Sequence, residues 1–154
     1  MKISTSYFYQ IRYFKPNMLP VSTAVYDPVW FYSKTGASRV YKDRNGIWNG
    51  VRFPTLSPMS LGEGLCDKTT GCIPDNCIFL TKYMEYLNSL DFQKVYNALN
   101  TFAKHFASIE KVDDVHIVLI VHESPTNPCS ERIPLQQFFT NNGIVCKELD
   151  YPIK

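Results

Sequence analysis

The sequence predicts an α/β fold, with a mostly parallel central sheet flanked by helices and an irregular middle segment. Three observations support this fold class. The run from Val115 to Val121 is apolar almost throughout, as expected of a strand that is covered on both faces. Two segments before this run repeat apolar residues at helical spacing. The pattern after it predicts a helix and then a strand, and this order implies a right-handed parallel crossover.

The composition indicates a single folded domain over residues 1–154. A chain of 154 residues buries roughly two thirds of the surface that its unfolded form exposes. Apolar residues make up 45% of the chain, which excludes the low-hydrophobicity class of disordered proteins. No apolar run approaches the roughly 18 residues of a bilayer span, and the first residues lack the apolar stretch of a secretory signal. We therefore expect a cytoplasmic protein with no membrane partner.

The first half of the chain predicts strands and turns. β-branched and aromatic residues over 2–8 and 19–26 predict two strands, and a helical turn over 9–14 lies between them. Residues 27–77 form the irregular segment, in which repeated glycine and proline turn signals exclude a long helix. Within it, residues 40–42 and 47–48 are expected to pair as a small hairpin around residues 44–46.

The second half predicts helices around the apolar strand. Apolar residues recur at helical spacing over 78–87, and a longer apolar stripe from Phe92 to Phe106 follows Asp91, which is suited to cap a helix. After the strand at 115–121, a helix from about Ser130 to Asn142 is expected to end at Gly143, a natural left-handed cap. Residues 144–149 then predict a final strand.

The loop between Val121 and the following helix is the candidate site. In open α/β sheets, ligands bind beyond the carboxyl ends of the strands, where loops enter helix N-termini. A helix N-terminus beside an arginine favours a thiolate or a bound anion. The loop supplies the polar side chains of His122, Glu123, Cys129, Ser130 and Arg132. If the protein is an enzyme, Glu123 is the expected general base and Cys129 the expected nucleophile.

A structural interpretation of the same loop stays open. In that interpretation Ser130 caps the helix, Glu131 complements its dipole, Arg132 pairs locally and Cys129 packs as a small apolar group. Cysteine-phosphatase chemistry is disfavoured, because in the phosphatase loop the cysteine precedes the arginine by six residues. His105 and His116 are expected to be packing or surface residues, whereas His122 stands at the strand end, where a pocket is expected.

The five cysteines cannot form a complete disulfide framework, because their number is odd. Free thiols in a reducing compartment are therefore the expectation. Cys66, Cys72 and Cys77 are separated by five and four residues, whereas structural zinc prefers tighter cysteine pairs and a fourth ligand. We expect no metal and no cofactor.

Charge is unevenly distributed along the chain. Residues 1–60 hold eight lysines and arginines against two aspartates, whereas residues 61–154 hold eight against twelve acidic residues. Cations and aromatic rings alternate between residues 30 and 53, as in grooves that bind single-stranded nucleic acid. The alternative is a solvated basic loop with buried aromatic rings. The residues concerned are Trp30, Phe31, Tyr32, Lys34, Arg39, Tyr41, Lys42, Arg44, Trp48, Arg52 and Phe53.

The two ends of the chain resemble a bacterial and phage family known as domain of unknown function four-eight-eight. Residues 3–8, 19–22 and 24–30 resemble its N-terminal region. Residues 118–125 and 129–132 resemble its C-terminal signature, an apolar strand, an acidic residue and then a Cys-His-Arg step. Here the step is Cys129-Ser130-Glu131-Arg132, so the histidine is missing and the arginine stands one place later. The resemblance implies a compact α/β fold with a polar pocket at the strand ends. The length also resembles that of small accessory proteins of T4-like phages, one of which is encoded near the DNA ligase.

The preferred hypothesis is a small phage-type accessory protein that binds a nucleotide or a nucleic-acid-derived anion. Its pocket is expected to contain Tyr7, Tyr26, His122, Glu123, Cys129 and Arg132. Arg132 and the helix N-terminus would hold phosphate, and the aromatic rings would stack a base. Two alternatives remain: a non-catalytic protein that binds a host factor through residues 30–53, and a sequence-independent binder of single-stranded nucleic acid.

Overall fold

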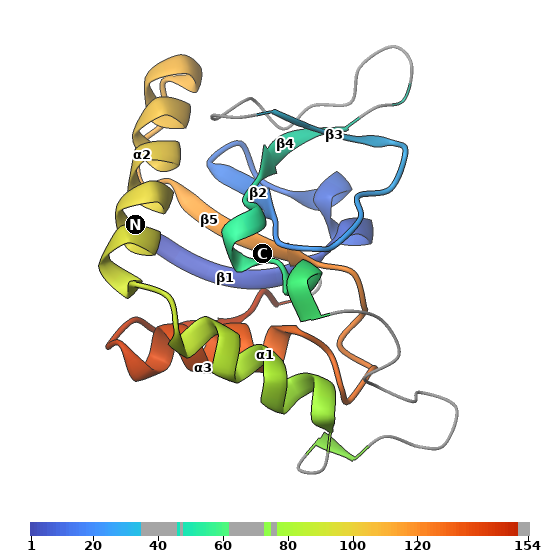
Figure 1. Ribbon diagram of the computed structural model, residues 1–154. Helices are drawn as coiled ribbons and strands as arrows, with labels where there is room; N and C mark the ends of the chain where they lie inside the picture. Colours follow the sequence, from blue (N-terminus) through green and yellow to red (C-terminus); the bar gives the residue numbers. More distant parts are fainter. Residues whose placement is uncertain (35–45, 47, 62–72, 75–76, 151–154) are drawn as a thin grey trace.

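Six parallel strands form one sheet in the computed structural model, in the order β3-β4-β2-β5-β1-β6 (Figure 1). The structure describes residues 1–34, 46, 48–61, 73–74 and 77–150. The strands are β1 (Lys2–Tyr7), β2 (Met18–Ser22), β3 (Phe31–Lys34), β4 (Trp48–Arg52), β5 (His116–Val121) and β6 (Cys146–Glu148). The predicted α/β class and the parallel sheet are therefore confirmed.

The apolar strand β5 lies in the middle of the sheet, as predicted. It pairs with β2 on one side and with β1 on the other, and all six of its residues are buried. Its side chains alternate between the two faces of the sheet. Ile117, Leu119 and Val121 belong to one apolar cluster, whereas Val118 and Ile120 belong to another. The sheet therefore has two separate cores.

Three α-helices cover the face with the larger core (Figure 1). They are α1 (Ile78–Asn88), α2 (Phe92–Glu110) and α3 (Arg132–Asn141), and α1 packs against α3. Helix α2 begins as predicted, because the Asp91 carboxylate accepts hydrogen bonds from the backbone amides of Gln93 and Lys94. Gly143 has the predicted left-handed conformation, with φ of 82°. These local signals set the helix ends.

The opposite face carries the short 3-10 helix η1 (Phe8–Tyr13) and a cluster of aromatic residues. Phe8 contacts Trp30 and Phe31 edge to face, with ring centroids 6.1 and 5.3 Å apart. None of the α-helices that the structure describes contributes a residue to this core. The prediction that helices flank the sheet is therefore confirmed for one face. The other face is covered by η1 and its neighbouring loops.

The middle segment contains two strands of the sheet, of which the sequence predicted only a short strand at residues 47–48. β3 and β4 pair in parallel, with Phe31 opposite Trp48, and β4 also pairs with β2. A Cβ atom on Gly50 of β4 would lie 2.5 Å from the Phe31 ring and 2.9 Å from the Pro20 side chain, so glycine permits this close packing. The hairpin expected around residues 44–46 involves residues 40–45 and 47, which lie outside the described residues.

Two further 3-10 helices follow β4, η2 (Pro54–Leu56) and η3 (Pro58–Leu61). Tyr83 of α1 connects to this segment, because its buried hydroxyl donates a hydrogen bond to the carbonyl oxygen of Leu56. Among the described helices, none is both long and apolar enough to cross a membrane.

Candidate functional site

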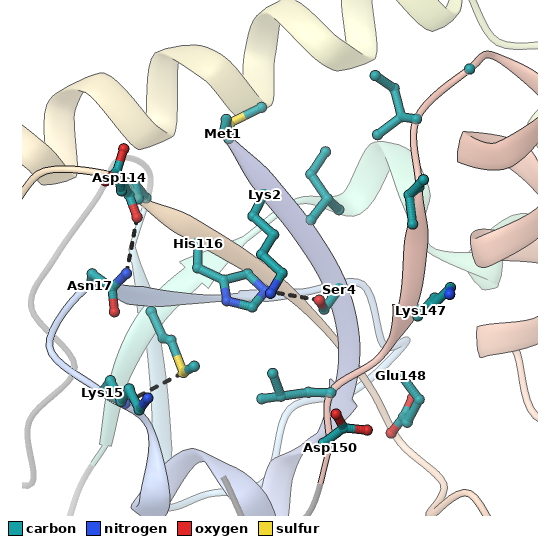
Figure 2. Close-up of a pocket in the computed structure, with 17 residues that line it drawn as sticks. Met1, Lys2, Ser4, Lys15, Asn17, Asp114, His116, Lys147, Glu148 and Asp150 are labelled. Atoms are coloured by element: carbon teal, nitrogen blue, oxygen red, sulfur yellow. Dashed lines mark hydrogen bonds between the residues drawn. The ribbon is translucent and has the colours of Figure 1, made fainter. Parts of the chain in front are cut away.

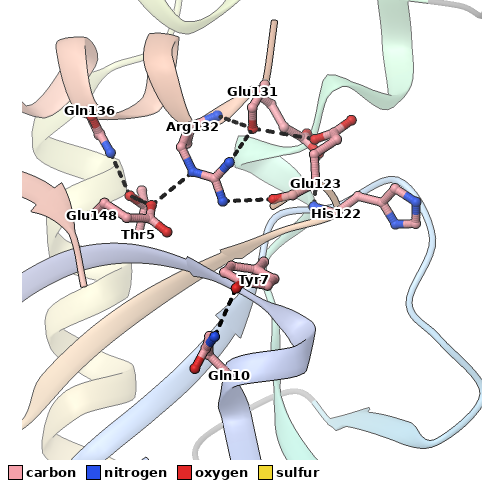
Figure 3. Close-up of polar contacts among 10 residues, drawn as sticks. Thr5, Tyr7, Gln10, His122, Glu123, Glu131, Arg132, Gln136 and Glu148 are labelled. Carbon is pink, nitrogen blue, oxygen red and sulfur yellow. Dashed lines mark hydrogen bonds and ion pairs between the residues drawn. The ribbon is translucent and has the colours of Figure 1, made fainter. Parts of the chain in front are cut away.

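A polar network lies at the carboxyl ends of β1, β5 and β6, as the strand–loop–helix pattern predicts. Arg132, the first residue of α3, is at its centre (Figure 3). Glu123 and Ser130 come from the loop after β5, and Glu148 comes from the end of β6. The structure therefore brings together three of the predicted site residues, Glu123, Ser130 and Arg132, and it places the ring of a fourth, Tyr7, beside Arg132.

Arg132 is held by protein groups on three sides. Its Nε donates to Glu148 Oε1 at 2.9 Å, its Nη1 to Ser130 Oγ at 3.1 Å and its Nη2 to the carbonyl oxygen of Glu123 at 2.7 Å. The side chain is only 7% exposed, and its guanidinium carbon lies 5.9 Å from the centroid of the Tyr7 ring. The contacts with Ser130 and Glu123 agree with the structural interpretation, in which Arg132 pairs locally, whereas the ion pair with Glu148 comes from another strand.

Glu148 connects this arginine to β1 and to the middle of α3. Its Oε1 accepts from Thr5 Oγ1 at 2.8 Å, and Gln136 Nε2 donates to the same threonine oxygen at 2.7 Å. Burial raises the pKa of Glu148, although Arg132 and the Thr5 hydroxyl act in the opposite direction. Sequence reasoning missed all three of these residues, because Thr5 and Glu148 are 143 positions apart.

The remaining loop residues have local structural roles. Ser130 Oγ accepts from the backbone amide of Arg132 at 3.3 Å and donates to Glu123 Oε2 at 3.4 Å. Glu131 is buried at the N-terminus of α3, where its Oε1 accepts from the backbone amide of His122 at 3.3 Å. The exposed ring of His122 points away from Arg132 (Figure 3). Only the backbone of His122 therefore joins the network.

The two tyrosines expected to stack a base occupy different surroundings. Tyr7 is half-buried at the end of β1, and its hydroxyl accepts from Gln10 Nε2 at 2.8 Å. Tyr26 follows β2, which β5 separates from β1, and it is 74% exposed. Tyr26 makes no hydrogen bond or ring contact with the described residues of the Arg132 network. The structure therefore does not bring both rings to this network.

Cys129 is disulfide-bonded, and it is 1% exposed. A disulfide sulfur carries no thiolate, so the prediction of a Cys129 nucleophile and the expectation of free thiols at this position are wrong for this structure. Cys77 and Cys146 are free and buried. Burial, followed by the nearby Glu148, raises the pKa of the Cys146 thiol to about 12, which keeps this thiol protonated at neutral pH.

The cysteine segment lies mostly outside the described residues. Cys66 and Cys72 lie outside the described residues, and Cys77 packs in an apolar cluster with Leu80 and Cys129. Within the ranges that the structure describes, no group of three histidine, cysteine, aspartate or glutamate residues is placed to hold a metal ion.

The described part of the basic and aromatic segment favours its alternative interpretation. Phe31 and Phe53 are buried, and Trp30 and Trp48 pack against a core. The guanidinium of Arg52 also interacts with protein groups. Its Nη1 lies 3.1 Å from Asp27 Oδ1, and its Nη2 donates to the carbonyl oxygen of Val25 at 2.8 Å. Residues 35–45, which include Arg39, Tyr41, Lys42 and Arg44, lie outside the described residues.

A cavity of about 960 Å³ is lined by residues at the amino ends of β1, β2 and β5 and by residues along β6, and it meets the Arg132 network at Glu148 (Figure 2). Sequence reasoning did not predict it. Its lining includes the lysines Lys2, Lys15 and Lys147, the uncharged polar residues Ser4 and Asn17, and His116. The register places Lys2 beside His116, and Ser4 beside Lys147, on neighbouring strands. These four side chains therefore share one face of the sheet, because alternate residues of a strand point the same way.

His116 is a buried polar residue of the cavity lining, as is Ser4. Its Nε2 lies 2.8 Å from Ser4 Oγ, and burial, together with the positive charge of Lys2, lowers the pKa of His116 to about 4. The imidazole is therefore neutral at pH 7. Asp114, Asp150 and Glu148 also line the cavity, but Glu148 is ion-paired with Arg132. The other charged side chains of the lining are those of three lysines and two aspartates.

The lowered pKa of His116 predicts a loss of stability in mild acid. Between about pH 6.5 and 4 the unfolded chain binds a proton at His116 that the folded chain does not, so stability falls as the pH falls through this range. The full loss is on the order of 3 kcal/mol. Urea unfolding of wild type and His116→Asn, at about pH 7 and about pH 4.5, measures it. The variant should lose less stability than wild type, and equal losses would contradict this assignment.

Comparison with known proteins adds no relative. No family model, no curated protein and no solved structure matches the chain. A function is therefore inferred from the residues of the Arg132 network and of the lysine-lined cavity.

Proposed function

We propose that the protein binds a phosphate-bearing ligand of nucleotide size in the cavity at the amino ends of β1, β2 and β5. The observation that carries this proposal is the presence of Lys2, Lys15 and Lys147 in the lining of one cavity of about 960 Å³. Small-molecule sites have volumes of roughly 300–1,000 Å³, so this cavity has room for a whole mononucleotide.

The mixed lining suits a nucleotide better than a bare anion. Ammonium groups are strong partners for phosphate oxygens. The Ser4 hydroxyl and the neutral His116 ring supply uncharged hydrogen-bonding groups in the cavity lining. Asp114 and Asp150 can accept hydrogen bonds from sugar hydroxyls or from amino groups of a base.

The Arg132 network is the less suitable place for phosphate. Three nitrogens of its guanidinium already donate to Glu148, Ser130 and the Glu123 carbonyl. A phosphate there would have to displace these groups and would approach the carboxylates of Glu123 and Glu148. We therefore keep a nucleotide as the proposed ligand, but we propose that it binds in the lysine-lined cavity and not at Arg132.

Thermal unfolding with added ligand tests the proposal. We expect purine or pyrimidine nucleoside monophosphates to stabilise the wild type by an amount that rises with the logarithm of their concentration and reaches about 2.7 kcal/mol at one hundred times the dissociation constant. Lys2→Ala removes a charge-assisted hydrogen bond, worth about 1.5–3 kcal/mol, and should weaken binding by roughly 10- to 100-fold.

A matched control separates this effect from a general loss of positive charge. Lys82 is exposed on α1, which covers the other face of the sheet, so Lys82→Ala should bind as the wild type does. Inorganic phosphate, tested alone, distinguishes recognition of a phosphate group from recognition of a nucleotide. Absence of stabilisation by every nucleotide would contradict the proposal, and equal binding by wild type and Lys2→Ala would exclude Lys2 from the site.

A non-catalytic interaction with a protein partner is the second candidate function. The segment between β2 and β3 exposes apolar side chains, with Val29 95% exposed and Tyr26 74% exposed. Exposed apolar residues of this kind are typical of protein interfaces. The resemblance to phage accessory proteins would make that partner a host factor. Under this candidate, Val29→Asp and Tyr26→Ala abolish capture of the partner, and nucleotides leave thermal stability unchanged.

A further inference from the structure

We infer that the protein hydrolyses the phosphate monoester that it binds, with Ser4 as the nucleophile and His116 as its general base. This inference rests on the proposed function, because it takes the lysine-lined cavity as the place of a nucleoside monophosphate. It gives that site a reaction in addition to a ligand.

Ser4 and His116 belong to neighbouring strands, and both line the cavity (Figure 2). In the parallel pair of β1 and β5, the residue opposite His116 is Lys2, and Ser4 stands two residues further along β1. Lys2 and Ser4 point to the same face of the sheet, because alternate residues of a strand do so. The His116 ring reaches the serine diagonally, with Nε2 2.8 Å from Ser4 Oγ. This distance is within the hydrogen-bond reach that a nucleophile and its general base require.

The imidazole of His116 is in the protonation state that a general base requires. Burial, followed by the positive charge of Lys2, lowers the pKa of His116 to about 4, so the ring is neutral at pH 7. A neutral ring has one nitrogen without a hydrogen, and when this nitrogen is Nε2 it accepts from the Ser4 hydroxyl. A bound phosphate brings negative charge beside Lys2. This charge opposes the effect of the lysine and raises the pKa of His116 toward the range in which a base is most effective.

Positive charges flank the position at which the phosphorus would be attacked. Lys2 precedes Ser4 on the same face of β1, and Lys147 of β6 stands opposite Ser4 in the strand register. Both lysines line the cavity. Their ammonium groups are suited to bind the non-bridging phosphate oxygens and to stabilise the charge on these oxygens in the transition state. The cavity therefore combines a nucleophile, a base and a source of electrostatic stabilisation.

The reaction has two steps, and water is its only co-reactant. In the first step Ser4 Oγ forms a bond with phosphorus, and the bond between phosphorus and the ester oxygen breaks with its electron pair on that oxygen. His116 accepts the hydroxyl proton of Ser4 and passes it to the leaving oxygen, which departs as a hydroxyl group of the nucleoside. In the second step a water oxygen bonds to phosphorus, the bond from phosphorus to Ser4 Oγ breaks, and His116 transfers a proton from the water to Ser4. The products are a nucleoside and inorganic phosphate.

Release of inorganic phosphate from adenosine monophosphate tests this inference. The wild type should release phosphate, and Ser4→Ala should lower kcat by at least about a thousandfold, because the covalent step needs the hydroxyl. His116→Asn keeps a polar side chain without the base, so it should lower kcat by about 100- to 10,000-fold. Both variants should still be stabilised by the nucleotide in thermal unfolding, because they retain the lysines of the cavity.

Ser6 provides the matched control. It is a buried serine of the same strand, and it is not among the described residues that line the cavity. Ser6→Ala should therefore keep the kcat of the wild type, and circular dichroism checks that each variant is folded. A second measurement needs no variant. Acid quenching of the wild type during turnover, followed by peptide mass spectrometry, should find a phosphoryl group on Ser4.

The outcomes separate this inference from the proposal on which it rests. Phosphate release that Ser4→Ala loses and Ser6→Ala keeps supports the inference, as does a phosphoryl group on Ser4. Nucleotide binding without phosphate release, or equal kcat in wild type and Ser4→Ala, overturns it and leaves the nucleotide site standing. Absence of monophosphate binding in the wild type overturns the proposed function itself.

Discussion

Replacement of Arg132 by methionine is expected to lower the free energy of unfolding by about 3–5 kcal/mol, the usual cost of removing one partner from a buried ion pair. The guanidinium is 7% exposed and donates to Glu148, Ser130 and the carbonyl oxygen of Glu123. Its removal leaves the Glu148 carboxylate buried without a counter-charge. Urea unfolding at neutral pH measures the loss.

A second variant shows whether the cost comes from the unpaired charge. Arg132→Met combined with Glu148→Met removes both charges, so it should recover part of the stability that the single variant loses. The single variant should also retain nucleotide binding, because the proposed ligand site is the lysine-lined cavity. A loss below about 1 kcal/mol, the range of exposed ion pairs, would show that Arg132 is not held as described and is available to a ligand.

Reduction of the disulfide at Cys129 is expected to lower the free energy of unfolding by about 2–4 kcal/mol, because the cross-link restricts the unfolded chain. Urea unfolding with and without a phosphine reductant measures the change. Cys129→Ala should unfold at a similarly low urea concentration and should no longer respond to the reductant.

Cys146→Ala is the matched control for the disulfide. Cys146 is a free buried thiol, so this variant should keep the full response to the reductant. Alkylation of the unfolded, unreduced wild type gives an independent check, because Cys77 and Cys146 should be modified while Cys129 stays protected. Alkylation of Cys129 without reduction would contradict the disulfide.

Much of the fold could be predicted because its signals are local. The apolar run of β5, the capping carboxylate of Asp91 and the left-handed Gly143 each act within a few residues. β3 and most of β4 could not be predicted in this way. They are short, β4 contains Gly50, and their pairing depends on contacts between distant parts of the chain.

The candidate site was predicted in part for the same reason. Glu123, Ser130 and Arg132 belong to one loop and one helix start, so their proximity follows from the local pattern. The ion pair between Arg132 and Glu148 could not be predicted, because Glu148 lies on another strand. The oxidation state of Cys129 could not be predicted either, because an odd number of cysteines does not show which of them are paired.

The lysine-lined cavity left a weak signal that could have been used. Lys2, Ser4 and Ser6 alternate along β1, which places polar side chains on one face of a strand near the centre of the sheet. In a parallel sheet such a face is ordinarily apolar, so this alternation indicates that polar groups are needed there, although Ser4 and Ser6 are themselves buried. His116 of the neighbouring strand extends this polar face.

A crystal structure of the protein with a bound nucleoside monophosphate tests the central claim most directly. The account predicts phosphate density beside Lys2, with the rest of the ligand near Ser4 and His116, while Arg132 keeps its contacts with Glu148 and Ser130. Phosphate bound by Arg132 at the N-terminus of α3, with the lysine-lined cavity empty, would contradict it.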